Sequence, residues 1–230
     1  MISLLIATGN RNKMREFERL LQPGFSLRES GAYPEIGEIA EDGSTFEANA
    51  RLKATAVSRQ VEGWVLADDS GLEVESLGGQ PGVRSARFAG EGASDAENRA
   101  RLLRELAMLS GKASRAARFC CVLALARSGE VVATFEGVVE GQIAPGERGA
   151  RGFGYDSLFC PRGRHETFAE LPAEEKDRLS HRGAAVERLR RFLERRRPVT
   201  DLGAEGEAAA VPHQARPARQ RVHRRRRALS

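Results

Sequence analysis

The apolar positions in the first 25 residues predict a strand followed by a helix. The continuous apolar run Ile2–Ala7 is typical of a short strand that is buried on both faces. After a polar segment, apolar residues recur at helical spacing from Met14 to Leu21, and Pro23 ends the helix. A turn therefore joins the carboxyl end of a strand to the start of a helix.

A second helix is predicted by the capping box Ser44-x-x-Glu47, which we expect to open it. Lys53 falls on the same face of this helix as its apolar stripe. Lysine is seldom placed inward without a partner, so this position is unusual. The inward stripe consists of Phe46, Ala50, Ala54 and Val57.

The remaining pattern alternates strands with helices. A strand over Trp64–Ala67 runs into Asp-Asp-Ser-Gly, where we expect it to end, and a capping box that begins at Ser94 opens a third helix. Two long apolar runs joined at Ser128 predict an antiparallel pair of strands, and residues 185–193 predict a last helix. Strands and helices in alternation, with one long hairpin, indicate a mixed α/β fold.

The net charge of +5 at pH 7 originates in the last part of the chain. Residues 197–230 contain eight arginines and three acidic residues, whereas the basic and acidic residues of 1–196 cancel. This last segment lacks apolar periodicity and has few large apolar residues, as disordered segments do. We expect one domain over 1–196 and a disordered, arginine-rich tail over 197–230. The tail either contacts anionic partners or is a solvated extension.

Composition also narrows the class of protein. No run of about 18 apolar residues is present, so we expect no transmembrane helix and no membrane partner. The N-terminus lacks the features of a signal peptide. The three cysteines, Cys120, Cys121 and Cys160, are odd in number and lack metal-ligand spacing, which favours a reducing, cytoplasmic compartment. We expect no nucleic-acid partner except through the tail.

The first strand–turn–helix unit has the features of an anion site. The turn exposes unpaired backbone N–H groups at a helix N-terminus, and Gly9 allows close approach of a ligand. Thr8 and Asn10 add short polar side chains. Lys13 lies in the first helical turn, where a cation is unfavourable unless an anion compensates it, and we expect a polyphosphate to do so. An ordinary turn with a surface lysine is the alternative.

Two adjacent carboxylates follow the strand over Trp64–Ala67. Asp68 and Asp69 can serve one site only if the strand ends there, because successive strand residues point to opposite faces. Such a pair suits Mg²⁺, and one carboxylate can accept a proton from a water molecule. An Asp-x-Gly turn is the alternative. Glu38, Glu41 and Asp42 form a second acidic cluster, which either adds a metal ligand or is plain surface charge.

Two further segments carry binding chemistry. In "GFGYD", Phe153 and Tyr155 offer surfaces on which a flat base can stack, and Asp156 can accept hydrogen bonds from a base or sugar. The segment "EEKDRLSHRG" gathers basic donors that suit a phosphate or a keto oxygen. Core aromatic residues and a solvated basic patch are the alternatives. Those basic donors are Lys176, His181 and Arg182.

Taken together, the cationic segments, the acidic site and the aromatic loop predict a Mg²⁺-dependent enzyme that acts on a nucleoside polyphosphate. The ordered motifs "ATGNRNK", "TFEANARLKA", "LADDSGLEVESLGGQPGVRSAR", "FGYDSLF" and "LSHRG" closely resemble the inosine triphosphate pyrophosphatase family. The resemblance spans about residues 2–195 and leaves out the tail. It implies an elongated, two-lobed α/β fold with a central substrate cleft. It also implies Mg²⁺-dependent hydrolysis of dITP, ITP and XTP to the monophosphate and pyrophosphate, by a homodimer.

The resemblance also implies roles for individual residues. Asp69 resembles the proton acceptor and a metal ligand, with Asp68 beside it, and Glu41 is our choice for a further ligand. The resemblance implies the role of a cleft lysine for Lys53. It implies phosphate-binding roles for Thr8, Gly9, Asn10, Arg11, Asn12, Lys13 and Ser70. It implies nucleoside-binding roles for Phe153, Gly154, Tyr155, Asp156, Lys176, His181 and Arg182.

The chain departs from the family pattern at Ala48, where an acidic residue is common, and at Ser157, where proline commonly follows "FGYD". Neither position has an assigned role. Two other functions remain open: a nucleotidase that acts on modified pyrimidine triphosphates, and a non-catalytic nucleotide- or nucleic-acid-binding protein that uses the basic tail. The binding function predicts that Asp69→Asn leaves binding intact and that deletion of 197–230 removes it.

Overall fold

The computed structural model describes residues 2–33, 37, 39–109 and 114–196, and the predicted tail lies outside them. The described residues form a six-stranded sheet of order β2-β1-β3-β4-β5-β6 with helices against it. The predicted α/β class, a mixed sheet flanked by helices, is confirmed. Among the residues described, no helix is long and apolar enough to cross a membrane.

The strands of the described residues are β1 (Ile2–Ala7), β2 (Phe25–Glu29), β3 (Trp64–Val74), β4 (Ala116–Arg127), β5 (Glu130–Ile143) and β6 (Phe159–Pro161). Their α-helices are α1 (Arg11–Leu21), α2 (Phe46–Ser58), α3 (Asp95–Met108), α4 (Ala173–Leu179) and α5 (His181–Arg195). Short 3₁₀ helices in the same part of the chain are η1 (Ser30–Ala32), η3 (Glu75–Leu77) and η4 (Gly82–Arg87).

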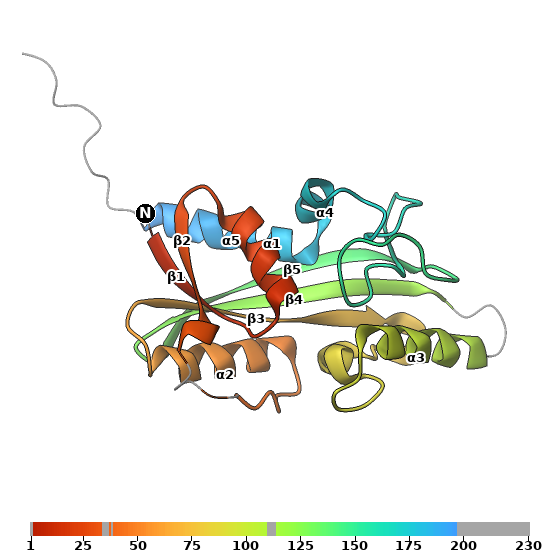
Figure 1. Cartoon of the computed structure of the whole chain (residues 1–230), viewed down its shortest axis with the longest axis horizontal. Coiled ribbons are helices and arrows are strands. Elements are labelled where there is room, and N and C mark those ends of the chain that lie inside the picture. Colours follow the sequence, from red (N-terminus) through yellow and green to blue (C-terminus); the bar gives the residue numbers. More distant parts are fainter. Residues whose placement is uncertain (1, 34–36, 38, 110–113, 197–230) are drawn as a thin grey trace, which may run out of the picture. The chain divides into compact units, whose positions relative to one another are not determined.

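The sheet combines a parallel and an antiparallel part. β1 pairs in parallel with β2 and β3, whereas β3, β4, β5 and β6 are antiparallel neighbours. The predicted hairpin turn at Ser128 is present between β4 and β5. Figure 1 shows α1 and α5 on one side of the long strands and α2 on the other. The turn after β1 and the middle of β3 therefore lie between helical layers.

Alternate residues of the strands pack into different apolar clusters. Leu66 of β3 belongs to a cluster with α1 and α5 on one face of the sheet. Ala67, the next residue, belongs to a cluster with α2 on the other face. Toward the far ends of β3 and β4, Leu72 and Phe119 pack with Leu102 of α3 in a third cluster. This alternation decides on which face each polar residue of β3 lies.

The prediction that the strand after Trp64 ends at Asp-Asp-Ser-Gly is wrong. β3 continues to Val74, and its ladder with β4 runs through Gly71, which pairs with Cys120. A Cβ atom at Gly71 would lie 2.6 Å from the carbonyl oxygen of Gly82. Glycine at this position therefore permits the close approach of η4 to the strand and does not mark a turn.

The prediction that Ser44 caps the second helix is also wrong, by one residue. Thr45 is the N-cap, and its hydroxyl accepts a hydrogen bond from the Ala48 amide at 3.1 Å. Thr45 has the extended backbone conformation that an N-cap residue adopts. The capping box at Ser94, by contrast, is present as predicted, with both of its hydrogen bonds.

Candidate active site

One pocket of about 680 Å³ gathers most of the predicted site residues. It is bounded by the turn after β1, by α2, β3 and η4, by the start of α3, by the 152–156 loop and by the start of α5. Three predicted residues, Arg11, Asn12 and Asp68, are not among those that line it. The predicted residues that line the pocket are Thr8, Gly9, Asn10, Lys13, Glu41, Lys53, Asp69, Ser70, Phe153, Gly154, Tyr155, Asp156, Lys176, His181 and Arg182.

The turn after β1 is fixed by its own polar side chains. Asn10 is the N-cap of α1, and its side-chain oxygen accepts hydrogen bonds from the amides of Asn12 at 2.9 Å and Lys13 at 3.2 Å. The Thr8 hydroxyl accepts from the Asn10 amide, and Ser30 of η1 donates to the Thr8 carbonyl at 3.0 Å. The turn therefore lines the pocket in a defined conformation, with the amides of Asn12 and Lys13 already capped by Asn10.

The anion that compensates Lys13 belongs to the protein itself. The ammonium group of Lys13 donates to a carboxylate oxygen of Asp68, whose side chain is fully buried. The expectation that a polyphosphate alone makes Lys13 tolerable in the first turn of α1 is therefore corrected. Asp68 holds Lys13 at the pocket wall before any ligand is present.

Asp68 and Asp69 lie on opposite faces of the sheet, because β3 continues through both. Asp68 faces α1 and α5, where it also contacts Ser70 and accepts from Arg182 Nε at 3.0 Å. Burial alone would raise the pKa of Asp68, but the charges of Arg182 and Lys13 reverse the effect and hold its pKa well below the usual range. The metal role predicted for Asp68 stays a prediction, and its partners in this structure are cations.

Asp69 faces α2 and has a different environment. One of its oxygens accepts from the side-chain amide of Asn49 at 3.0 Å, and Lys53 Nζ lies 4.0 Å from the other. Burial raises the pKa of Asp69, and the opposing charges of Lys53 and Lys13 do not overcome it. A carboxylate with a raised pKa in a pocket is a better proton acceptor than an exposed one.

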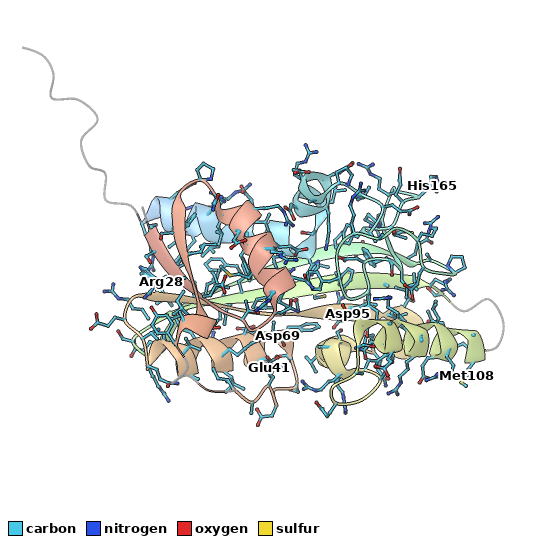
Figure 2. The ribbon with its side chains drawn as sticks, in the orientation of Figure 1. Arg28, Glu41, Asp69, Asp95, Met108 and His165 are labelled. Atoms are coloured by element: carbon cyan, nitrogen blue, oxygen red, sulfur yellow. The ribbon has the colours of Figure 1, made fainter. Side chains whose placement is uncertain are left out.

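The unusual inward position of Lys53 is explained by this part of the pocket. Its ammonium group donates to the Asp68 backbone carbonyl at 2.6 Å and to a Glu41 oxygen at 3.1 Å. Figure 2 labels Glu41 and Asp69, which lie near each other on the α2 side of the long strands. Lys53 thus stands between two carboxylates, from positions 41 and 69, that line one pocket.

This carboxylate pair fits a magnesium ion. Mg²⁺ prefers oxygen ligands and is usually held by one or two carboxylates, water and substrate phosphates. Within the described part of the chain, no group of three or more His, Cys, Asp or Glu side chains is arranged for a metal. Glu41 and Asp69 are therefore a donor set suited to Mg²⁺ with a phosphate substrate, and not one suited to a metal that needs an all-protein cage.

A buried chain of alternating charges connects the two ends of the pocket. Its centre is Glu16 of α1, which is 4% exposed and receives Lys176 Nζ at 2.7 Å and an Arg182 guanidinium nitrogen. Burial alone would raise the pKa of Glu16, but Arg182 and Lys176 lower it to about 2. In spatial order the chain consists of Lys13, Asp68, Arg182, Glu16, Lys176 and Asp156.

The aromatic loop, residues 152–156, lies at the other end of this chain. The ammonium group of Lys176 lies 5.0 Å from the ring centroid of Phe153. The amide of Phe153 donates a hydrogen bond to Asp156 at 2.9 Å. Tyr155 is part of the apolar core and donates its hydroxyl to the Ser85 carbonyl at 2.9 Å. Phe153 is thus the aromatic side chain of this loop that has the more open surface, because it is half-buried while Tyr155 is buried.

His181 is buried at the start of α5 and stacks on Phe119 with ring centroids 4.8 Å apart. Its Nδ1 atom finds no hydrogen-bond partner among the residues that the structure describes. Burial and the nearby charge of Arg182 hold the pKa of His181 well below its usual range. The imidazole is therefore neutral at pH 7, with one donor nitrogen and one acceptor nitrogen.

A titration followed by NMR tests this protonation state. Between pH 5.5 and 8, the ring nitrogens of His181 should keep the shifts of a neutral imidazole, because the lowered pKa keeps the ring uncharged. The resonance is assigned by its loss in His181→Gln. In urea the same ring should titrate near pH 6.5. Protonation of the folded protein near pH 6.5 would contradict the neutral assignment.

Several residues of the pocket and of the charge network are absent from the sequence predictions, among them Glu16, Asn49, Arg87 and Asp95. Asn49 lies one position from the predicted stripe of α2 and is fully buried, yet a buried asparagine in a helix gives no clear signal in one sequence. Arg87 lines the pocket and donates to the Glu41 carbonyl at 3.0 Å. Glu16 and Asp95 are typical of exposed helix positions, and only their distant partners distinguish them.

The fold and the pocket define a class of protein. It is an α/β protein whose pocket joins a cationic turn at a helix N-terminus, the Glu41–Asp69 carboxylate pair and an aromatic loop, as a nucleoside polyphosphate site requires. The chain belongs to the Ham1 family, whose model matches residues 4–192. The family resemblance drawn from the motifs is confirmed.

Known proteins agree with this assignment. A protein of Bacillus subtilis (strain 168) named dITP/XTP pyrophosphatase is 45% identical over 195 residues, which are 84% of this chain and 98% of that one. One of the same name from Streptococcus pyogenes serotype M3 is 48% identical over 81% of this chain, and the match spans 57% of that protein. The solved structure of a HAM1 protein from Coxiella burnetii has a TM-score of 0.77 at 38% identity, over 85% of this chain and all of that one.

Proposed function

We propose that this chain hydrolyses the non-canonical purine nucleoside triphosphates dITP, ITP and XTP to the monophosphate and pyrophosphate, with Mg²⁺. The observation that carries the proposal is one pocket that is lined by residues of the turn after β1, by the Glu41–Asp69 pair and by residues of the 152–156 loop. The relatives named dITP/XTP pyrophosphatase support this choice of reaction and substrate. Such an enzyme removes deaminated purine nucleotides from the nucleotide pool.

The phosphate chain is assigned to the turn after β1. Thr8, Gly9, Asn10 and Lys13 line the pocket at the start of α1, and Ser70 adds a hydroxyl that contacts Asp68 and Arg182. Because Lys13 is already paired with Asp68, it is held in position for the departing pyrophosphate. Arg87, which also lines the pocket, supplies a further cation near Glu41.

The proton acceptor is assigned to Asp69. Its carboxylate, oriented by Asn49 and by its neighbour's amide, takes a proton from the water molecule that attacks the α-phosphorus. Glu41 and Asp69 would hold Mg²⁺, which supplies charge stabilisation for the phosphate oxygens and lowers the pKa of bound water. Lys53 positions both carboxylates through its contacts at 3.1 and 4.0 Å.

The base is assigned to the 152–156 loop and the start of α5. Phe153 offers a ring on which a purine stacks. We assign to the neutral imidazole of His181 and the buried guanidinium of Arg182, which both line the pocket, the donation of hydrogen bonds to the 6-keto oxygen, which a 6-amino purine lacks. The guanidinium already donates to Asp68, Glu16 and Ser70, so its orientation is fixed before the base arrives.

Two broader parts of the proposal rest on the family resemblance and on composition. We assign a homodimer in the cytoplasm, where the three free and buried cysteines of this chain remain reduced. A role of the tail in binding nucleic acid is the alternative, and its residues lie outside those described.

Product analysis with ITP, XTP, dITP, GTP, ATP and dUTP, each with and without Mg²⁺, tests the proposed function. We expect pyrophosphate from the first three only, and only with the metal. Release of orthophosphate would mean that a different bond is cleaved and that the assigned position of the phosphates is inverted. Preferential cleavage of dUTP would favour a pyrimidine nucleotidase, and no turnover of any substrate would favour the binding function.

A further inference from the structure

The 152–156 loop is held by a helix to which the proposed mechanism gives no role. The amide of Gly154 donates to Asp95 Oδ2 at 2.7 Å, and its carbonyl accepts from Arg99 Nη1 at 2.9 Å. Asp95 is the first residue of α3, and Arg99 lies one turn later on the same helix. Two charged side chains of α3 therefore bind both hydrogen-bonding groups of one loop residue. We call Asp95 and Arg99 the α3 clamp.

The residue that the α3 clamp holds determines the direction of the loop. Gly154 has a left-handed backbone conformation, with φ of +60°, which favours glycine. No heavy atom lies within 4 Å of a Cβ atom built at this position, so its conformation, and not lack of space, requires glycine. Its peptide groups lie between Phe153 and Tyr155. Because Gly154 shares a peptide bond with Phe153, the contacts that hold Gly154 also restrain the backbone next to Phe153.

The α3 clamp is itself anchored. Ser94 and Glu97 form a complete capping box at the start of α3, and Asn98 binds the Ala89 amide at 2.7 Å and the Ala86 carbonyl at 3.0 Å. Arg99 Nε lies 2.9 Å from a Glu147 oxygen, an ion pair whose angle does not make a hydrogen bond. The first two turns of α3 are thus a fixed support. Asn98 attaches them to η4, and Arg99 attaches them to Glu147, which precedes the loop.

Charge makes this contact stronger than an ordinary loop contact. Hydrogen bonds to charged groups contribute more than neutral ones. The Arg99 side chain is 18% exposed, whereas Asp95 is an exposed residue, which Figure 2 labels at the start of α3 and which lines the same pocket as Gly154. Solvent therefore screens the contact of Arg99 only in part and that of Asp95 more strongly.

We propose that Asp95 and Arg99 are positioning residues for base recognition, which act through Gly154 to orient Phe153. This role rests on the proposed function, because it concerns the binding of the purine in that same pocket. The α3 clamp takes no part in the reaction at the phosphorus, since Asp69 and Lys13 are held by α2, α1 and α5 and not by α3. Its removal should therefore weaken nucleotide binding more than it slows the chemical step.

The test compares Asp95→Ala and Arg99→Met with Arg104→Met, a control on an exposed position of the same helix. With dITP and Mg²⁺, we expect the first two to raise KM about 10- to 100-fold, the range that loss of a charged hydrogen bond gives, and to change kcat by less than about threefold. Inhibition by pyrophosphate, which lacks a base, should be unchanged. Asp95→Asn keeps an acceptor oxygen for the Gly154 amide without the charge and should restore only part of the lost affinity.

Hydrogen–deuterium exchange gives a readout that needs no substrate. In Asp95→Ala the amides of residues 152–156 should exchange faster than in Arg104→Met, because the Gly154 amide has lost its acceptor. Arg99→Met leaves the helix cap intact and provides a second measure if Asp95→Ala is unstable.

The outcomes separate the α3 clamp from the proposed function. If the wild-type protein cleaves dITP, and both α3 variants match Arg104→Met in KM, kcat and exchange, the α3 clamp is overturned and the function stands. The α3 clamp would also be overturned if the α3 variants lost pyrophosphate affinity and kcat as much as they lost affinity for dITP, because such a uniform loss indicates a general structural defect. If the wild-type protein cleaves no purine nucleoside triphosphate, the proposed function fails first, and the role in base recognition fails with it.

Discussion

Asp69→Asn is expected to lower kcat by about 10²- to 10⁴-fold, the range in which a positioned general base contributes. Asparagine has the same shape but cannot accept the proton from the attacking water, and it is a poor ligand for Mg²⁺. The measurement is the rate of pyrophosphate release from dITP at saturating substrate and metal. The matched control is Asp42→Asn, an exposed acid of the cluster next to Glu41.

The same variant should fold normally. Burial raises the pKa of Asp69, so the folded protein bears a cost for its charged form, and a neutral side chain of equal size removes that cost. We expect a thermal midpoint at or above that of the wild-type protein. Retention of full turnover in Asp69→Asn would remove this residue from catalysis. Nucleotide binding that survives Asp69→Asn but disappears on deletion of 197–230, in a protein without turnover, would favour the binding function.

Glu16→Gln should destabilise the protein by about 3 kcal/mol at pH 7. The folded-state pKa of Glu16 is about 2 against an ordinary 4.5, and a gap of this size corresponds to about 3 kcal/mol of unfolding free energy. Glutamine leaves Lys176 and Arg182 without a buried counter-charge, and loss of one partner of a buried pair is strongly destabilising. Urea unfolding at pH 7 measures the difference.

The pH dependence has a definite sign. Because folding lowers the pKa of Glu16, its contribution is complete above about pH 4.5 and is lost as the pH falls toward 2. The difference between wild type and Glu16→Gln should therefore shrink between about pH 5 and pH 2. Glu18→Gln, an exposed acid on the same helix, is the control. Equal effects of the two substitutions across this range would contradict the network role of Glu16.

Periodicity and motif spacing predicted the class of fold and many of the residues that line the pocket, because both depend on local patterns. The inward position of Lys53 followed from the stripe of α2, and the hairpin at Ser128 from two apolar runs. Gly71 was misleading, because a glycine that permits close packing and a glycine that forms a turn have the same sequence signal. The error moved Asp68 and Asp69 to one face, although β3 places them on two.

Residues that act through distant partners could not be predicted from one sequence. Glu16 sits one turn after Lys13 and is typical of an exposed helix position, yet its partners Lys176 and Arg182 lie 160 and 166 residues away. Asp95 is typical of a helix first turn, where an acid is favoured by the dipole, and its contact with Gly154 spans 59 residues. Only the tertiary fold brings these groups together.

The buried chain of alternating charges has a consequence for how the protein is made. Glu16 and Asp68 are synthesised early, whereas Lys176 and Arg182 emerge from the ribosome near the end of the domain. A nascent chain that stops before Lys176 leaves Glu16 without either of its cations and Asp68 with Lys13 alone, so burial of Glu16 is unfavourable until both cations are present. Products truncated before Lys176 should therefore be less stable than the complete domain and should be degraded more readily by proteases.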